Sequence, residues 1–144
     1  MSTLTFRKTL TANDVGATGG HQSGVTTPKT NRELFEMLPK LDATVKNPRV
    51  LLECLDEHGE RHSLTFIYYN NKLHDPKGTR NEYRITPLTD YFRRANAKEG
   101  DAFEISKNTL EGFYRIRLVK KEQVEEEASC LPRRIKLTGW HRVH

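Results

Sequence analysis

Hydrophobic positions along the chain fall in short runs that alternate with polar residues, a pattern typical of β-strands. The clearest case is the segment GFYRIRLVK at residues 112–120, where arginines alternate with Tyr114, Ile116 and Leu118. Similar runs predict strands over residues 4–10, 49–56, 61–70, 102–106 and 134–143. Residues 49–56 and 61–70 are separated by a four-residue turn, EHGE, and are therefore expected to form an antiparallel hairpin.

Two segments instead have apolar residues spaced as on one face of a helix. They are residues 28–38, with Thr30 or Asn31 as the cap, and residues 87–97, with a proline at the start. The sequence thus predicts about six strands and two short helices, mostly antiparallel. A chain of 144 residues suits one domain. The fold class expected is mainly β, a barrel or pseudobarrel whose ends are closed by two helices.

Three polar segments interrupt this pattern. Residues 11–27 hold four glycines and almost no apolar side chains, and residues 71–83 are polar, basic and rich in turn formers. Both are predicted to be long loops, and a loop of that length in a small domain usually has a function. The acidic segment 121–132, with four glutamates, is predicted to be a solvated linker or a helix.

Composition excludes several classes of protein. No stretch approaches the roughly 18 to 20 consecutive apolar residues of a membrane span, and the N-terminus lacks the apolar core of a signal peptide. Two cysteines, Cys54 and Cys130, cannot form a disulfide framework. We therefore expect a soluble protein of a reducing compartment, with no membrane partner.

The net charge of +5 is unevenly distributed along the chain. Residues 71–98 have seven cations and three anions, residues 133–144 have four cations and no anion, and residues 33–70 have a net charge of −3. Basic segments that converge on one face would form a phosphate-binding surface. Charge alone leaves the alternative of an ordinary solvated surface open.

Signals for catalysis or metal binding are few. None of the six histidines stands with a cysteine pair, and no Walker A, GxSxG or HExxH pattern occurs. Asp75-Pro76-Lys77 matches the Asp/Glu-x-Lys tripeptide of metal-dependent nucleases, with Asp56 upstream as a second carboxylate. Because the tripeptide lies in a turn-rich loop and not on a central strand, a nuclease site there is only an alternative.

The second polar loop contains an array suited to base edges. Arg80, Glu82 and Arg84 are two residues apart and share one side if the segment is extended. An arginine can bind guanine through O6 and N7, a glutamate accepts from cytosine N4, and Asn81 can pair with an adenine edge. The competing interpretation is a set of weak surface ion pairs. In the first loop, Asn13, Asp14, His21 and Gln22 offer further donors and acceptors, beside glycines that permit close approach.

The two loops together resemble a known family. The order TANDVGATGGHQSG, IYYN and KGTRNEYRIT, within residues 7–87, is similar to the N-terminal DNA-binding domain of the EcoRII restriction endonuclease family. That resemblance implies a seven-stranded pseudobarrel like the plant B-three DNA-binding fold, with two arms that grip the major groove. It also implies recognition of CCWGG duplexes by an effector domain, with cleavage in a separate domain. One departure is Gly78, where the family pattern has a lysine directly before Thr-Arg.

The resemblance also assigns roles to residues. Carried over by position, Arg80, Glu82 and Arg84 would read bases together with Asn13, Asp14, His21 and Gln22, and Lys8 and Lys72 would bind phosphate. Asn81 is a further candidate base reader, and Lys77 and Thr79 are further candidate phosphate ligands. No catalytic residue, metal site or cofactor is expected in this domain, and Mg²⁺ is expected only for a separate catalytic domain of the same polypeptide.

The main hypothesis is therefore sequence-specific binding of duplex DNA by the recognition domain of a type II, type IIE-like restriction endonuclease in the cytoplasm of a prokaryotic cell. Residues 1–144 would form that single domain. Two alternatives stay open: a small nuclease using Asp56, Asp75 and Lys77, and a protein-interaction domain whose basic loops bind an acidic partner.

Overall fold

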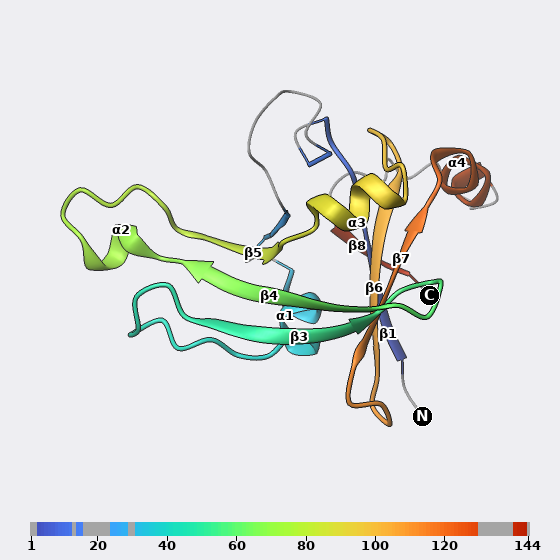
Figure 1. Ribbon diagram of the computed structural model, residues 1–144. Coiled ribbons are helices and arrows are strands. Elements are labelled where there is room, and N and C mark those ends of the chain that lie inside the picture. The colour runs from blue at the N-terminus through green and yellow to red at the C-terminus, as the bar shows by residue number, and fades with distance from the viewer. Residues whose placement is uncertain (1–2, 13, 16–23, 29–30, 130–139, 144) are drawn as a thin grey trace.

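Eight strands join into one curled sheet in the computed structural model, which describes residues 3–12, 14–15, 24–28, 31–129 and 140–143 (Figure 1). The strands are β1 (Thr3–Thr9), β2 (Val25–Thr27), β3 (Arg49–Leu55), β4 (Arg61–Tyr69), β5 (Glu82–Thr86), β6 (Ala102–Asn108), β7 (Tyr114–Val119) and β8 (Trp140–Val143). The helices are α1 (Arg32–Met37), α2 (Asn71–His74), α3 (Thr89–Arg94) and α4 (Lys121–Ser129). None of these helices is long and apolar enough to cross a membrane.

The strand order is β2-β5-β4-β3-β7-β6-β1-β8, and the pairing is antiparallel except between β3 and β7. That parallel contact is short, joining Cys54 and Leu55 to Tyr114 and Arg115. The predicted 49–56 and 61–70 hairpin is confirmed in β3 and β4, which pair over their whole facing length. The mainly β, antiparallel fold class predicted from the sequence is confirmed.

The core lies on the concave side of the sheet. Phe6, Phe66 and Phe103 are at most 1% exposed and come from three different strands. Helix α1 covers this core because Phe35 packs against Phe66 and Tyr83. Helix α3 covers the core at β6, where its Tyr91 and Phe92 meet Phe103. Further buried core side chains include Leu34, Met37, Ile85, Ile105 and Ile116.

A side chain joins the two edge strands of the sheet. The indole N–H of Trp140, on β8, donates to the carbonyl of Thr26, on β2, at 2.7 Å. The same ring meets Phe103 edge to face, with centroids 6.3 Å apart. Since β8 and β2 stand at opposite ends of the strand order, this contact closes the curled sheet toward a barrel without a continuous backbone ladder.

This closure can be tested with Trp140→Phe, which keeps an aromatic ring against Phe103 and removes the donor. We expect the free energy of unfolding to fall by about 1 kcal/mol, the usual net value of one hydrogen bond. Urea denaturation measures it. Arg142→Ala, on the same strand, removes an exposed ion pair with Glu33 and should lower the free energy of unfolding by less. Equal midpoints for Trp140→Phe and the parent chain would contradict the closing role.

Several details differ from the sequence predictions. The predicted loop 11–27 ends in a strand, β2, and the predicted loop 71–83 contains α2 and the start of β5. The sheet therefore has eight strands, where the sequence pattern predicts about six and the family resemblance implies seven. Short edge strands such as β2 carry too few residues for a period-2 pattern to be detected. The acidic segment, for which linker and helix were both open, forms α4 at residues 121–129. Residues 134–139 of the last predicted strand lie outside the described residues.

Candidate nucleic-acid interface

Two long connections, the arms, lead into the paired strands β2 and β5. The first arm, residues 11–24, connects β1 to β2, and the second arm, residues 70–81, connects β4 to β5 and carries α2. In Figure 1 the second arm projects well beyond the curled part of the sheet, with α2 near its tip. Because β2 and β5 pair antiparallel, with Val25 opposite Ile85 and Thr27 opposite Tyr83, the first arm ends at one end of this strand pair and the second arm enters β5 at the other.

The second arm is anchored to the body of the protein by Asn70, whose side chain is fully buried. Its amide donates to the carbonyls of Ala43 and Val45 at 3.3 and 2.8 Å, and its oxygen accepts from the backbone N–H of Asn47 at 2.7 Å. The backbone N–H of Asn70 also donates to the Asn47 side chain. These bonds fix the point at which the chain leaves β4.

Farther out, the two halves of the second arm are bonded to each other. The N–H of Lys72 donates to the carbonyl of Arg80 at 3.0 Å, and the N–H of Arg80 donates to the side chain of Asn71 at 2.7 Å. Gly78 lies so close to Asn71 that an added Cβ would be 2.1 Å from its carbonyl oxygen. A lysine at position 78 therefore does not fit this arm, and the exposed Lys77 stands one place earlier.

Arg80 and Glu82 are presented together at the base of the arm. The Arg80 guanidinium lies 3.7 Å from the centroid of the Tyr69 ring, and its Nη2 is 2.5 Å from a Glu82 carboxylate oxygen. The two side chains remain 43% and 34% exposed. Stacking on Tyr69 limits the rotamers of Arg80, so less entropy is lost when a ligand orders it. Sequence reasoning did not single out Tyr69, although it belongs to the IYYN segment.

Arg84 has a different setting from Arg80. Its side chain is on β5 and the residue is only 9% exposed. Nη1 donates to the hydroxyl of Thr26 and Nη2 donates to the carbonyl of Gly24, both at 2.9 Å. Arg84 therefore ties Gly24, the end of the first arm, to β5. The three-residue array is split into an exposed pair, Arg80 and Glu82, and a buried member, Arg84.

Asn81 is held by an aromatic platform under the second arm. The Tyr68 hydroxyl donates to the Asn81 side-chain oxygen at 2.5 Å. The Tyr68 and Tyr83 rings stack with centroids 4.0 Å apart and planes 4° apart. Burial, and then the neighbouring Tyr68, raise the pKa of Tyr83, so the Tyr83 side chain is uncharged at neutral pH. The bond to Tyr68 fixes the orientation of the Asn81 side-chain amide.

In the first arm, the structure describes Asp14 but not Asn13, His21 or Gln22, which lie outside the described residues. The Asp14 carboxylate forms an ion pair with the ammonium group of Lys8, and both side chains are 11% exposed. It also accepts from the backbone N–H of Thr11 at 3.0 Å, while the Thr11 hydroxyl accepts from the N–H of Asp14. This pair shapes the start of the arm. A phosphate contact by Lys8, or a base contact by Asp14, stays a prediction.

The predicted phosphate ligands on the second arm are accessible. Lys72, Lys77 and Thr79 are all exposed. Lys46, from the segment that anchors the arm, forms an ion pair with Asp75 at 2.6 Å and adds a cation that sequence reasoning did not include. The arm therefore offers several cations on a hydrogen-bonded backbone.

The nuclease alternative is not supported by this arrangement. Asp56 follows β3 at the hairpin turn, whereas Asp75 follows α2 on the second arm. The nine residues of β4 stand between these two places, which is about 30 Å of extended strand. The described structure therefore does not bring Asp56, Asp75 and Lys77 together. Cys54 is no nucleophile either, because burial and the nearby Glu53 raise the pKa of its thiol to about 12.

Comparison with known proteins agrees with this geometry. One curated relative, "Type II restriction enzyme EcoRII" of Escherichia coli, is 41% identical over 89 residues, which cover 56% of this chain and 20% of the relative. The chain thus matches about one fifth of that enzyme's length. Among solved structures, a chain of the Arabidopsis FUS3–DNA complex matches with a TM-score of 0.61 at 19% identity, covering 81% of this chain and 97% of that one. The expected likeness to the plant B-three fold is confirmed.

The family comparison covers both arms. The model of the family described as "Restriction endonuclease EcoRII, N-terminal" matches residues 1–100, which run from β1 through the end of α3. With both polar arms, the aromatic base and the Arg80–Glu82 pair inside the matched region, the chain belongs to the EcoRII N-terminal family.

Proposed function

We propose that this chain binds duplex DNA sequence-specifically, at CCWGG or a related site, as the recognition and effector domain of a type II, type IIE-like restriction endonuclease in the cytoplasm of a prokaryotic cell. The observation that carries the proposal is the Arg80–Glu82 pair, which is exposed and oriented by Tyr69 at the base of a basic arm. The FUS3 relative of similar fold is in complex with DNA, and the EcoRII relative is a restriction enzyme.

The chemistry of the pair suits neighbouring G·C base pairs. A guanidinium binds guanine O6 and N7 with two parallel hydrogen bonds, and a carboxylate accepts from the N4 amino group of cytosine. Arg80 and Glu82 already contact each other, so on binding DNA each exchanges an ion-pair contact for a base contact. Exposed ion pairs contribute little, and this exchange therefore costs little.

Phosphate contacts would position the arms on the duplex. Lys72 and Lys77 are exposed on the second arm, as is the hydroxyl of Thr79. Lysine contacts to phosphate release counterions and confer affinity without reading sequence. In this proposal, the second arm supplies both kinds of contact, and the first arm adds Asn13, Asp14, His21 and Gln22 from the other side of the groove.

Cleavage belongs, in this proposal, to a separate catalytic domain that would require Mg²⁺. The EcoRII relative is about five times as long as the part matched here, which leaves room for such a domain. Incubation of the chain with plasmid and Mg²⁺ checks this assignment. Cutting by the 144-residue chain would overturn it and revive the nuclease alternative.

Gel-shift titration with a CCWGG duplex and a scrambled duplex at physiological salt tests the binding itself. Specific protein–DNA complexes are typically about 10³-fold or more tighter than non-specific ones. We expect a preference of that order for the CCWGG duplex or for a related sequence recovered by binding-site selection. Equal affinity for all duplexes would refute sequence recognition. Absence of any duplex binding would favour the protein-interaction alternative.

Lys72→Ala tests the phosphate role on the second arm. We expect it to weaken binding to specific and scrambled duplexes by the same factor, and to lower the slope of log K against log salt concentration by about 1. Lys121→Ala is the matched control, since Lys121 is an exposed lysine on α4, away from the second arm in Figure 1. A salt slope that Lys72→Ala leaves unchanged would remove Lys72 from the interface.

A further inference from the structure

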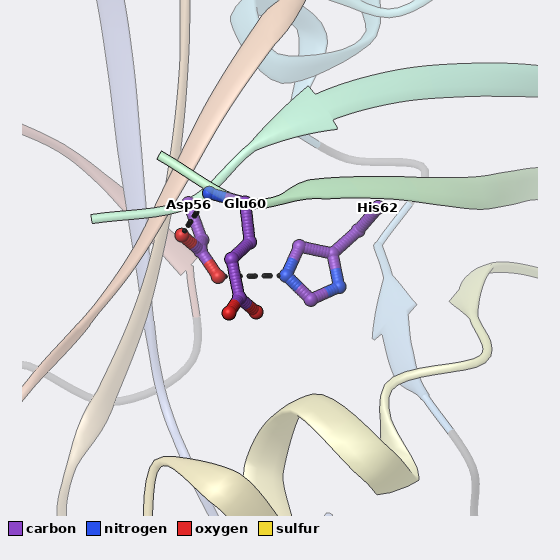
Figure 2. A group of neighbouring side chains, drawn as sticks. All are labelled: Asp56, Glu60 and His62. Atoms are coloured by element: carbon purple, nitrogen blue, oxygen red, sulfur yellow. Dashed lines mark hydrogen bonds and ion pairs between the residues drawn. The ribbon is translucent and has the colours of Figure 1, made fainter. Parts of the chain in front are cut away.

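A second group of functional side chains lies at the β3–β4 turn, away from both arms. The turn has the sequence DEHGERH, and it brings one oxygen of Asp56, one oxygen of Glu60 and one ring nitrogen of His62 within 4.8 Å of one another. Figure 2 shows the three side chains together at the end of the hairpin, with Asp56 and Glu60 in the turn and His62 on β4. Neither the proposed DNA contacts nor the hydrophobic core uses these groups.

The turn orients the Asp56 carboxylate. Asp56 is 8% exposed, and one of its oxygens accepts from the backbone N–H groups of His58 and Glu60 at 2.8 and 2.9 Å. The tight turn needs Gly59, whose φ of 80° lies in the left-handed region. The second oxygen of Asp56 is left to face His62, with its Nε2 at 2.7 Å.

His62 is also held in place. Its ring meets the Tyr91 ring edge to face, with centroids 5.3 Å apart and planes at 74°, and the side chain is 16% exposed. Tyr91 is itself fixed by a hydrogen bond from its hydroxyl to Glu57 at 3.0 Å. The imidazole therefore presents Nε2 to the carboxylates in one defined orientation.

The three side chains offer a donor set that suits a metal ion. Two carboxylates and an imidazole are ligands that a divalent transition-metal ion accepts in proteins.

We propose that Asp56, Glu60 and His62 bind one divalent transition-metal ion of the zinc class at the β3–β4 turn. Metal–ligand bonds of about 2.0–2.2 Å place the ligand atoms of a tetrahedral site roughly 3.3 Å apart. The Asp56 oxygen and His62 Nε2 need to separate by somewhat less than about 1 Å from their 2.7 Å contact to reach this spacing. Water fills the fourth position. This site departs from the sequence expectation of no metal in the domain, which weighed histidines beside cysteine pairs and the Asp56, Asp75 and Lys77 set but not Asp56 with Glu60 and His62.

Glu60 has one competing partner. Its carboxylate pairs with the Arg94 guanidinium at 3.0 Å, and the two side chains are 59% and 67% exposed. Such a pair contributes little to stability, so an ion of charge +2 displaces Arg94 readily. Because Asp56 and Glu60 both stand close to His62, a cation also relieves the repulsion between the two carboxylates.

The site would act as a clip on the hairpin and not as part of the DNA interface. All three ligands come from seven consecutive residues that join β3 to β4, and the second arm starts at the opposite end of β4. An ion bound here stabilises the folded chain in proportion to its occupancy. The proposal thus stands apart from the proposed function, and failure of either leaves the other untouched.

Isothermal titration of the tag-free chain with Zn²⁺, and the visible absorption spectrum of added Co²⁺, test the site. We expect one ion per chain and a higher thermal midpoint with Zn²⁺. Glu60→Gln, at an exposed position, and His62→Phe, which keeps a ring against Tyr91, should each lower the affinity by about 10-fold or more. Arg94→Gln should raise it, because it frees Glu60.

Two control variants make the result specific. Glu53→Gln removes an exposed carboxylate on the same hairpin, and His74→Asn removes a histidine on the second arm; neither should change Zn²⁺ affinity. Far-ultraviolet circular dichroism shows that each variant is folded. Absence of Zn²⁺ binding by the parent chain overturns the proposal, and so does binding that Glu60→Gln and His62→Phe leave unchanged.

Discussion

Arg80→Ala is expected to lower the affinity for the specific duplex by about 1–3 kcal/mol, or roughly 5- to 150-fold. The loss on a scrambled duplex should be much smaller, because only the specific complex uses the two parallel bonds to guanine. The fold should be unaffected, since the Arg80 side chain is 43% exposed and its ion pair with Glu82 is at the surface. Parallel gel-shift titrations measure the affinities for the specific and the scrambled duplex, and urea denaturation measures the free energy of unfolding.

Arg115→Ala is the matched control for that experiment. Arg115 is also an exposed arginine paired with a glutamate, Glu111, but it lies on β7, in a hairpin far from the second arm in Figure 1. Arg115→Ala removes the same charge as Arg80→Ala, and its effect on the affinity for both duplexes should be small. If Arg80→Ala reduces the affinities for specific and scrambled duplexes equally, Arg80 contributes charge and reads no base.

Much of the fold is predictable from local patterns. The alternation in 112–120, the hairpin of 49–56 and 61–70, and the Asn31 cap of α1 are all set by residues near one another in sequence, and all three are found. The predicted loop 71–83 includes the start of β5, because Glu82-Tyr83-Arg84 has charged side chains where a half-buried strand usually has apolar ones. Its burial depends on β2 and β4, which are distant in sequence.

The candidate site, like the fold, is only partly predictable from the sequence. The residue types and spacing of Arg80, Glu82 and Arg84 predict which chemistry is present, but not which side chains are accessible. Accessibility depends on long-range partners, namely the Thr26 hydroxyl and the Gly24 carbonyl for Arg84. Gly78 is similar, since only the fold shows that Asn71 occupies the space a side chain would need.

The two arms adjoin the same pair of strands, β2 and β5. Gly24 lies so close to β5 that an added Cβ would be 2.1 Å from the carbonyl oxygen of Ile85, and the adjoining residues pair with β5. Arg84, on β5, donates to that same Gly24. The separation of the arms is therefore set by the β2–β5 pair, and a binding surface made of both arms depends on these few contacts.

Arg84→Ala is accordingly expected to act on both stability and binding, unlike Arg80→Ala. Truncation leaves the buried Gly24 carbonyl without its donor, which costs about 1–3 kcal/mol of the free energy of unfolding. The same change loosens the end of the first arm and removes a proposed base-reading guanidinium, so affinity for the specific duplex should fall by about 1–3 kcal/mol as well. Urea denaturation and gel-shift titration on one preparation give both numbers.

Thr26→Val separates these two effects. It removes the hydroxyl that accepts from Arg84 Nη1 while the Arg84 side chain and its bond to Gly24 remain. If Arg84 acts by holding the arms together, Thr26→Val should lower both the free energy of unfolding and the specific affinity. Both losses should be smaller than for Arg84→Ala, and the ratio between them should be the same. If Arg84 acts by reading a base, Thr26→Val should leave specific affinity nearly unchanged, because a freed guanidinium still reaches the duplex. An Arg84→Ala variant as stable as the parent would exclude the linking role altogether.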